Sequence, residues 1–416
     1  MNPYPLEYFH FPLLKHISCY TETGNSMRKT YQFRLYPNKN QEVKLNSTLS
    51  TCRRLYNDSL AERKLQAELN RLRREFDVCP WGKPEWISCY EQQKATAANK
   101  TSYQKEVFSQ VLQNVLKRVD RSFKNFFNGF GYPRFQGRNR YNSFTYPQSG
   151  FGIENGKIIL SKIGAIKLIQ HREIEGKIKT CTIKKDIDQW YVTFSVEMDD
   201  PIPVEIKNEI GVDVGLYSLL RLSNDDRIEP PEFLRESEKK LSRRQIRLSR
   251  KKKGSHNRKK QTKIVAKTHR AIRNQRNDFA HKISRMLVNK YDKIVFEDLQ
   301  IQNMMQNHHI AKSIADAGWY QLIQLTTFKA ECAGKIVEQI NPKGTSQNCS
   351  GCGNPVPKDL KVRIHSCPFC GLVLDRDTNA ARNILARSKS TAGTAGINAC
   401  PSGLNRAMMT QDTQAL

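Results

Sequence analysis

The sequence predicts a multidomain α/β protein, with a β-rich first part that is interrupted by helices and a second part in which strands alternate with helices. Two patterns predict this class. Period-two alternation marks strands near the N-terminus and again after residue 142, and the segment between them has helical periodicity. Further on, two apolar strands that end in acids flank a long basic helical region. A chain of 416 residues is long enough for roughly two or three domains, each with its own core.

The first part opens on MRKTYQFRLYP (27–37), where polar and apolar residues alternate, and this predicts a strand that ends at Pro37. The periodicity then becomes helical, first from Gln41 to about Phe76 and again at 102–127. The second helical stretch carries a valine at every fourth position, which predicts a buried apolar stripe: Val107, Val111, Val115 and Val119.

Strand-like segments follow between residues 143 and 198, so the helices form an insertion between the first strand and the others. The two ends of the chain differ from this body. Residues 1–26 show no period, and residues 388–416 are mostly small and polar. We expect both ends to be disordered.

The second part begins with NEIGVDVGLYSLLRL (208–222), a predicted strand that contains an acid. Because side chains alternate along a strand, Gly211, Asp213 and Gly215 share one face. We interpret the two glycines as room for a bulky polyanion to approach the backbone beside Asp213.

A second acid ends the predicted strand in YDKIVFEDL (291–299). The run Ile294-Val295-Phe296 is apolar on both faces, as expected of a central strand, and Glu297 follows it. The neighbouring Asp298 must point the opposite way, so we take Glu297 as the residue that faces a site.

The third acid lies in LDRDTNAARNI (374–384). If a helix begins near Asp377, then Asp377, Ala381 and Ile384 fall on one face, which we expect to pack on the sheet. Asp375 lies before this helix and off that face. We therefore select Asp377.

Asp213, Glu297 and Asp377 together predict a magnesium site, because Mg²⁺ prefers oxygen ligands and binds through few carboxylates. Two such ions ~4 Å apart would stabilise the attacking water and the leaving oxygen of phosphodiester hydrolysis. Each acid also has a structural alternative, respectively a hairpin cap, a solvated strand end and a helix N-cap. The combination in one basic chain favours the metal site.

The net charge indicates a polyanionic partner. The chain has 69 Lys and Arg against 40 Asp and Glu, a formal charge of +29, and nucleic acid is the usual partner of such a surface. The charge is concentrated between Lys239 and Lys282, which enclose 18 Lys and Arg and one acid, Asp278. We expect Gly254-Ser255 to break this basic region into two helices.

Two cysteine pairs, CSGCG (349–353) and CPFCG (367–371), have the spacing of a zinc site. Four thiolates predict a closed, structural zinc, and the glycine after each pair relaxes the turn. The ligands are Cys349, Cys352, Cys367 and Cys370. His365 is a possible substitute ligand, although we expect it to be a surface residue. The predicted helix of Asp377 follows directly, so folding of the zinc site would fix the position at which that helix begins.

The chain has eleven cysteines, and the seven outside these two pairs are scattered singly along the sequence. This usage suits a reducing compartment. No apolar run approaches the roughly 20 residues of a membrane span, and no signal peptide is apparent. We expect a cytoplasmic, prokaryotic protein without membrane contact.

Several motifs together resemble the TnpB (OrfB) proteins of IS200/IS605-type transposons, which are similar to Cas12 nucleases. The resemblance covers about Met27 to Arg387 and is carried by YQFRLYPNKNQ, PRFQGRNRYNSFTYPQ, GVDVGL, IVFEDL and NPKGTSQNCSGCG with CPFCGLVLDRDTNAARNI. It implies an RNA-guided endonuclease that cleaves double-stranded DNA beside a short transposon-adjacent motif, using a guide RNA from the transposon end. By this resemblance the three acids are catalytic and the four cysteines bind zinc.

The resemblance also implies a domain order. A wedge β-barrel would occupy 27–204, with a helical recognition insertion at about 45–130. An RNase H-like (RuvC) nuclease domain would occupy 205–387, with the zinc ribbon inserted at 345–374. We expect a monomer associated with the nucleoid.

Arginines and lysines in both parts are predicted to contact phosphates: Arg53, Arg54, Arg134, Arg138, Arg140, Arg243, Arg244, Lys251, Lys252, Lys259 and Lys260. Aromatic residues interleaved with the first group either stack on bases or form the core of the barrel: Tyr132, Phe135, Tyr141, Phe144 and Tyr146. Two other functions stay open, a non-cleaving nucleic-acid-binding regulator of the same fold and a carboxylate-type DNA transposase.

Overall fold

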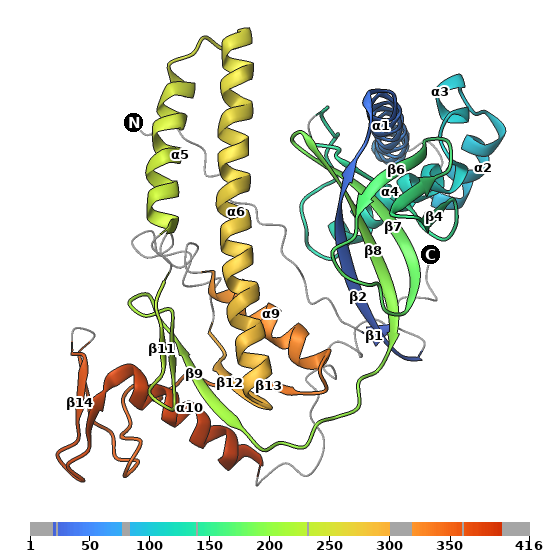
Figure 1. The fold of residues 1–416 in the computed structure, drawn as a ribbon. Coiled ribbons are helices and arrows are strands. Elements are labelled where there is room, and N and C mark those ends of the chain that lie inside the picture. The colour runs from blue at the N-terminus through green and yellow to red at the C-terminus, as the bar shows by residue number, and fades with distance from the viewer. Residues whose placement is uncertain are drawn as a thin grey trace. The chain divides into compact units, whose positions relative to one another are not determined.

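The computed structural model describes most of the chain and divides it into two compact units, Met1–Asp200 and Pro201–Leu416. Figure 1 colours the first unit blue to green and the second green to red. The described residues are 20–21, 24–76, 84–138, 140–230, 233–299, 318–359 and 362–392.

The first unit is built on an eight-stranded, nearly closed antiparallel sheet with the strand order β3-β7-β8-β2-β6-β5-β4, in which β1 pairs with β2 (Figure 1). The strands β2 and β8 pair from Ser26 opposite Asp199 to Leu35 opposite Trp190. Alternate side chains along β8 are buried, as expected where one face of a sheet covers the core. The strand bounds are β1 Tyr20–Thr21, β2 Gly24–Tyr36, β3 Ser143–Tyr146, β4 Phe151–Glu154, β5 Lys157–Leu160, β6 Gly164–Ile169, β7 Lys177–Asp186 and β8 Gln189–Asp199.

Four helices lie between β2 and β3, which confirms the predicted helical insertion. All four valines of the predicted stripe are buried, because α4 packs against α1 and the sheet. The prediction of one helix over 102–127 is wrong in detail, since a break separates the short α3 from α4. The helices are α1 Lys39–Glu75, α2 Cys89–Ala98, α3 Ser102–Lys105 and α4 Ser109–Phe127.

Both ends of the chain contain more regular structure than the sequence predicted. The strand β1 and the start of β2 lie within residues 1–26, and the rest of that leader lies outside the described residues. At the other end α10 continues to Ala392, so the first residues of the expected tail are helical. Residues 393–416 lie outside the described residues.

The second unit has a five-stranded mixed sheet in the order β11-β10-β9-β12-β13. The strands β9, β12 and β13 are parallel, whereas β10 pairs antiparallel with both β9 and β11. Every residue of β12 is buried, which confirms the predicted central strand. The bounds are β9 Glu209–Val214, β10 Leu220–Leu222, β11 Arg227–Ile228, β12 Lys293–Glu297 and β13 Ile336–Ile340.

Helices cover both faces of this sheet. Ile294 and Phe296 of β12 pack in one cluster with α6 (His256–Lys290) and α9 (Trp319–Glu331). Val295, which points to the opposite face, packs with Ile384 of α10 (Arg376–Ala392). Because Ala381 and Ile384 are fully buried, the predicted packing of this helix on the sheet is confirmed.

The basic region forms two helices, α5 (Phe233–Ser249) and α6, which confirms the predicted break. Gly254 at the turn has a φ of +83°, which favours glycine. Ser255 then caps α6 by accepting a hydrogen bond from the Arg258 backbone N–H. The Arg258 side chain also donates to the Leu248 and Lys251 carbonyls, at 2.9 and 2.8 Å.

A two-stranded hairpin, β14 (Ile364–Ser366) and β15 (Val373–Asp375), directly precedes α10. As for membrane insertion, none of the helices in the described ranges is long and apolar enough to cross a bilayer.

Candidate active site and cysteine metal centre

Asp213 and Glu297 lie at the same level on adjacent parallel strands. The strands β9 and β12 pair in register up to Val212 opposite Phe296, and each acid is the next residue of its strand. Side chains at matching positions of neighbouring parallel strands point to the same face. For Glu297 this is the face of Val295, against which α10 packs.

Asp213 is partly buried, and its surroundings oppose its negative charge. Burial raises the pKa of Asp213 well above its usual range, and the charges of Glu297 and Asp377 raise it further. The positive charge of Arg376 acts in the opposite direction. A cation bound between Asp213, Glu297 and Asp377 would favour the ionised form of Asp213, because it would offset the repulsion from the other two carboxylates.

Glu297 ends β12 and is only 8% exposed, whereas the neighbouring Asp298 is exposed. Burial raises the pKa of Glu297, although a hydrogen bond from the Thr345 hydroxyl and the charge of Arg387 act to lower it. The predicted choice between the two adjacent acids therefore agrees with their burial.

Asp377 lies in the first turn of α10, but it is not the N-cap of that helix. Asp375 takes this role, because its carboxylate accepts hydrogen bonds from the backbone N–H groups of Asp377 and Thr378, at 2.9 and 3.2 Å. Asp377 instead forms ion pairs with Arg376 and Arg363, at 3.1 and 3.7 Å. The structural alternative for Asp377 as a cap is therefore wrong.

Gly211 explains how α10 comes so close to these acids. A Cβ at this position would lie 2.1 Å from the Ala381 carbonyl oxygen and 2.9 Å from the Leu385 nitrogen. Gly215 faces the Ser218 carbonyl in the turn after β9. Our interpretation of these glycines as room for a polyanion is therefore wrong, because backbone of the same chain occupies the space.

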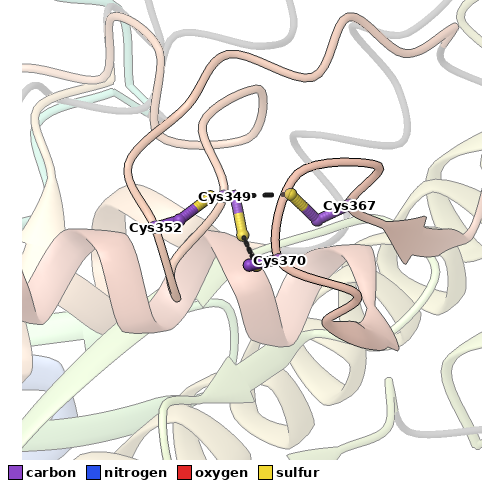
Figure 2. A group of neighbouring side chains, drawn as sticks. All are labelled: Cys349, Cys352, Cys367 and Cys370. Carbon is purple, nitrogen blue, oxygen red and sulfur yellow. Dashed lines mark hydrogen bonds between the residues drawn. The ribbon is translucent and has the colours of Figure 1, made fainter.

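The four cysteines converge, as Figure 2 shows. Within the described ranges they form the one group of three or more potential ligands whose atoms all lie within 4.8 Å of one another, and the three acids do not meet that separation. The sulfurs of Cys349 and Cys370 are 3.6 Å apart, as are those of Cys352 and Cys367. An all-sulfur set of four fits a closed, structural zinc site.

The two turns that present the sulfurs are built alike. Gly353 and Gly371, which follow the cysteine pairs, have φ angles of +79° and +72°, so glycine is favoured at both positions. Each N–H donates to the carbonyl of the first cysteine of its pair, at 2.9 and 3.0 Å. These contacts confirm the predicted role of the glycines.

Hydrogen bonds at the cysteine centre act differently on two of the sulfurs, because they favour the thiolate of Cys367, whereas the neighbouring sulfurs raise the pKa of Cys370 to about 12. Burial opposes ionisation of Cys367, but hydrogen bonds from the backbone N–H groups of Cys370 and Phe369 outweigh it and lower the pKa of Cys367 to about 6. His365 is fully buried beside this centre, so its predicted surface position is wrong. It is not part of the four-cysteine group.

Most of the predicted phosphate-contacting residues have exposed side chains, as such contacts require. Two do not. Arg53 is half-buried and donates to the Gln136 carbonyl, and Arg244 is half-buried and donates to the Thr268 hydroxyl. Both arginines therefore make hydrogen bonds within the fold. The exposed residues are Arg54, Arg134, Arg138, Arg140, Arg243, Lys251, Lys252, Lys259 and Lys260.

The aromatic residues divide between the two alternatives. Tyr141, Phe144 and Tyr146 are at most 8% exposed and belong to the core of the first unit. Tyr132 and Phe135 are exposed, and the Lys64 ammonium lies 5.0 and 4.5 Å from their ring centroids. Sequence reasoning missed Lys64, because nothing in the pattern of α1 shows which rings lie beside it.

Three family models match the chain. One described as a probable transposase, OrfB of IS605, matches residues 193–308, and a Cas12f1-like TNB domain matches 319–384. A helix-turn-helix domain matches 27–71. In the structure that last range is the strand β2 followed by most of the single helix α1.

Two relatives match most of the chain, and a third matches about half of it. InsQ of Escherichia coli strain K12, provisionally named an RNA-guided DNA endonuclease, is 31% identical over 86% of this chain and 92% of its own length. A Streptomyces pristinaespiralis protein with the same provisional name is 32% identical over 91% and 92%. The Cas12f1 endodeoxyribonuclease of Sulfoacidibacillus thermotolerans is 28% identical over 55% of this chain and 58% of its own.

The fold is also similar to that of a solved structure. Cas12f1, in its complex with a single guide RNA and target DNA, superimposes with a TM-score of 0.55 over 87% of this chain and 99% of that chain. The sequence identity is 15%, so this likeness concerns the fold alone.

Proposed function

This chain belongs to the TnpB (OrfB) family of IS605-type transposon proteins, and we propose that it is an RNA-guided, metal-dependent endonuclease that cleaves DNA beside a short transposon-adjacent motif. The family membership rests on relatives that share about a third of their residues over most of the chain. The observation that carries the catalytic proposal is the level pairing of Asp213 and Glu297 on adjacent strands.

In this proposal residues 205–387, within the second unit, form an RNase H-like (RuvC) nuclease domain with a zinc ribbon at 345–374. Residues 27–204, most of which belong to the first unit, form a wedge barrel whose helices are a recognition insertion. The mixed sheet that carries acids at one level, and the antiparallel sheet interrupted by helices, support this assignment.

Asp213, Glu297 and Asp377 would hold Mg²⁺ on the face of the sheet that α10 covers. When bound, Mg²⁺ lowers the pKa of a coordinated water and stabilises charge on the phosphate. The oxygen ligands and the mutual repulsion at Asp213 fit such an ion. Arg376 and Arg363, which pair with Asp377, would neutralise part of the charge of that carboxylate before the ion binds.

Recognition would be divided between RNA and protein. Base pairing with the guide RNA would read the target sequence, while the protein holds the heteroduplex by its phosphates. The exposed lysines near the turn between α5 and α6, and the exposed arginines at 134, 138 and 140, support this role. Tyr132 and Phe135 beside Lys64 offer exposed rings on which an unpaired base would stack.

The test uses the purified, zinc-loaded protein–RNA complex and a plasmid that carries the target, and it measures cleavage with and without added Mg²⁺. Asp213→Ala and Glu297→Gln should lower cleavage at least about a thousandfold, since each removes a proposed metal ligand. Asp298→Asn is the matched control, because this adjacent carboxylate is exposed, and the variant should cleave like the wild type.

Two further measurements, of target binding and of end joining, would identify the other two functions. Wild-type complex that binds target DNA without cutting it would identify a regulator instead of a nuclease. Joining of labelled transposon ends by the wild type would identify a carboxylate transposase. Cleavage that survives Asp213→Ala would contradict the assignment of the three acids.

A further inference from the structure

Thr345 connects the cysteine centre to one of the proposed catalytic acids. It is 2% exposed and lies between the end of β13 and the first cysteine pair. Its hydroxyl donates to a Glu297 carboxylate oxygen and lies 2.8 Å from the Pro342 carbonyl oxygen. A hydroxyl has one proton to donate, and an ionised carboxylate is the stronger acceptor.

The backbone of the same residue is held from the other side by α10. The Asn383 side-chain amide donates to the Thr345 carbonyl at 2.8 Å and to the Asn348 carbonyl at 2.7 Å. Thr345 is therefore not free to move independently of the helix that carries Asp377.

A second asparagine, one turn earlier on the same helix, completes the connection to the sulfurs. The Asn379 side chain donates to the Asn348 carbonyl at 2.7 Å and accepts from the Ser350 backbone N–H at 2.8 Å. Asn348 and Ser350 flank Cys349, so both chain neighbours of this cysteine are bonded to α10. Asn379 is fully buried, which excludes water as a competing partner.

We propose that Thr345 is a positioning residue for Glu297, and that through Thr345, Asn379 and Asn383 the folded cysteine turn sets where this carboxylate points. The inference rests on the proposed function and adds to it a residue that contacts no substrate. The cysteine centre would thus position two acids, Asp377 through the start of α10 and Glu297 through the Thr345 hydroxyl. Groups that hydrogen-bond to metal ligands typically change metal affinity about 10–100-fold when they are removed.

The experiment compares Thr345→Val with Thr345→Ser in the full-length, zinc-loaded protein. Mn²⁺ serves as the probe and is followed by electron paramagnetic resonance, and zinc content is measured in each sample. Thr345→Val keeps the shape and removes the hydroxyl, so Mn²⁺ should bind about 10–100-fold more weakly while zinc content is unchanged. Thr345→Ser keeps the hydroxyl and should restore binding to within a few-fold, on the order of the scatter between conservative variants.

Thr326→Val is the matched control. Thr326 is also fully buried in the second unit, but its hydroxyl donates to the Leu322 carbonyl within its own helix. This variant should bind Mn²⁺ like the wild type. Asn383→Leu tests the other half of the connection, and it should weaken Mn²⁺ binding while zinc content is unchanged.

Wild-type Mn²⁺ affinity in Thr345→Val, or equal losses in the Val and Ser variants, would overturn the inference. A wild type that binds Mn²⁺ without cleaving DNA would remove the proposed activity alone, whereas a wild type that binds no Mn²⁺ would overturn both.

Discussion

At the scale of the residue, the candidate site consists of carboxyl groups whose surroundings disfavour the ionised form. Asp213 has a raised pKa because of burial and then because of Glu297 and Asp377. Without a cation, ionised carboxylates placed this way repel one another and cost folding free energy. An ionised Asp213 therefore lowers the stability of the protein without a bound cation, whereas the proposed Mg²⁺ site requires the ionised form.

The corresponding prediction is that Asp213→Asn abolishes cleavage and stabilises the protein free of divalent ions. A raised pKa means that the folded state holds this proton more tightly than the unfolded chain. The wild type therefore loses stability as pH rises from the usual carboxyl range, near pH 4, to the raised pKa. Removing the charge should raise the unfolding temperature by about 2–4 °C at neutral pH, the effect of about 1 kcal/mol in a unit of this size.

Scanning calorimetry of the zinc-loaded protein without added Mg²⁺ or Mn²⁺, between about pH 4 and pH 8, measures this effect. The gain of Asp213→Asn over the wild type should be small at the acid end and grow with pH. Asp298→Asn, which removes an exposed charge, should show no such trend. A gain that shrinks as pH rises would contradict the charge explanation.

At the scale of the element, strands were predictable and their alignment was not. The apolar run before Glu297 predicts a central strand, and β12 is buried throughout. Glu297 lies level with Asp213 because two segments far apart in sequence pair as parallel strands in this register. No local sequence pattern contains that register. The start of α10 was predicted within one residue, yet its N-cap is Asp375.

Burial of individual side chains was the other limit on prediction from sequence. The sequence around Gly211 does not show whether a polyanion or a helix backbone lies against this glycine. Only the packed structure shows that the Ala381 carbonyl lies there. Likewise, Tyr141 and Phe135 occur in one motif, and only the packed structure shows that the first is buried and the second is exposed. Local chemistry predicts the residue types of a site, whereas contacts between distant segments decide their roles.

The prediction at this scale is that Gly211→Ala displaces α10. The new methyl group would meet backbone atoms of the helix at 2.1 and 2.9 Å, and backbone cannot move aside as a flexible side chain can. Such overpacking costs about 1–3 kcal/mol. The unfolding temperature should fall by about 2–12 °C, and cleavage should fall too, because Asp377 moves with the helix.

Gly152→Ala is the matched control for this change. Gly152 also lies in a strand, β4, and a Cβ there would meet no atom within 4 Å. Calorimetry and plasmid cleavage should therefore give nearly wild-type values for this variant. Equal effects of the two substitutions would show that loss of glycine in a strand, and not the contact with α10, is responsible.

At the scale of the whole molecule, the charge of +29 is distributed unevenly. The basic hairpin of α5 and α6 carries exposed lysines on both sides of its turn, while Arg244 and Arg258 within it hold the two helices together. The arginines that bond the two helices and the lysines proposed to bind phosphate are thus neighbours in sequence. The two groups differ in burial, because Arg244 and Arg258 are half-buried and therefore less accessible to a phosphate than the exposed lysines.

We therefore predict that replacing the four exposed lysines 251, 252, 259 and 260 with glutamine lowers the salt dependence of nucleic-acid binding without unfolding the protein. Each phosphate contact contributes about 0.7–0.9 to the slope of log affinity against log salt, so the loss of four contacts should lower the slope by about 3. Binding of the co-purifying RNA and of duplex DNA, measured separately by fluorescence anisotropy from about 50 to 200 mM salt, would show which of them the hairpin contacts. Arginine at the same positions keeps the charge and should preserve the slope. An unchanged slope in the glutamine variant for both nucleic acids would mean that the hairpin lies away from phosphates, and that the charge of this surface serves another partner.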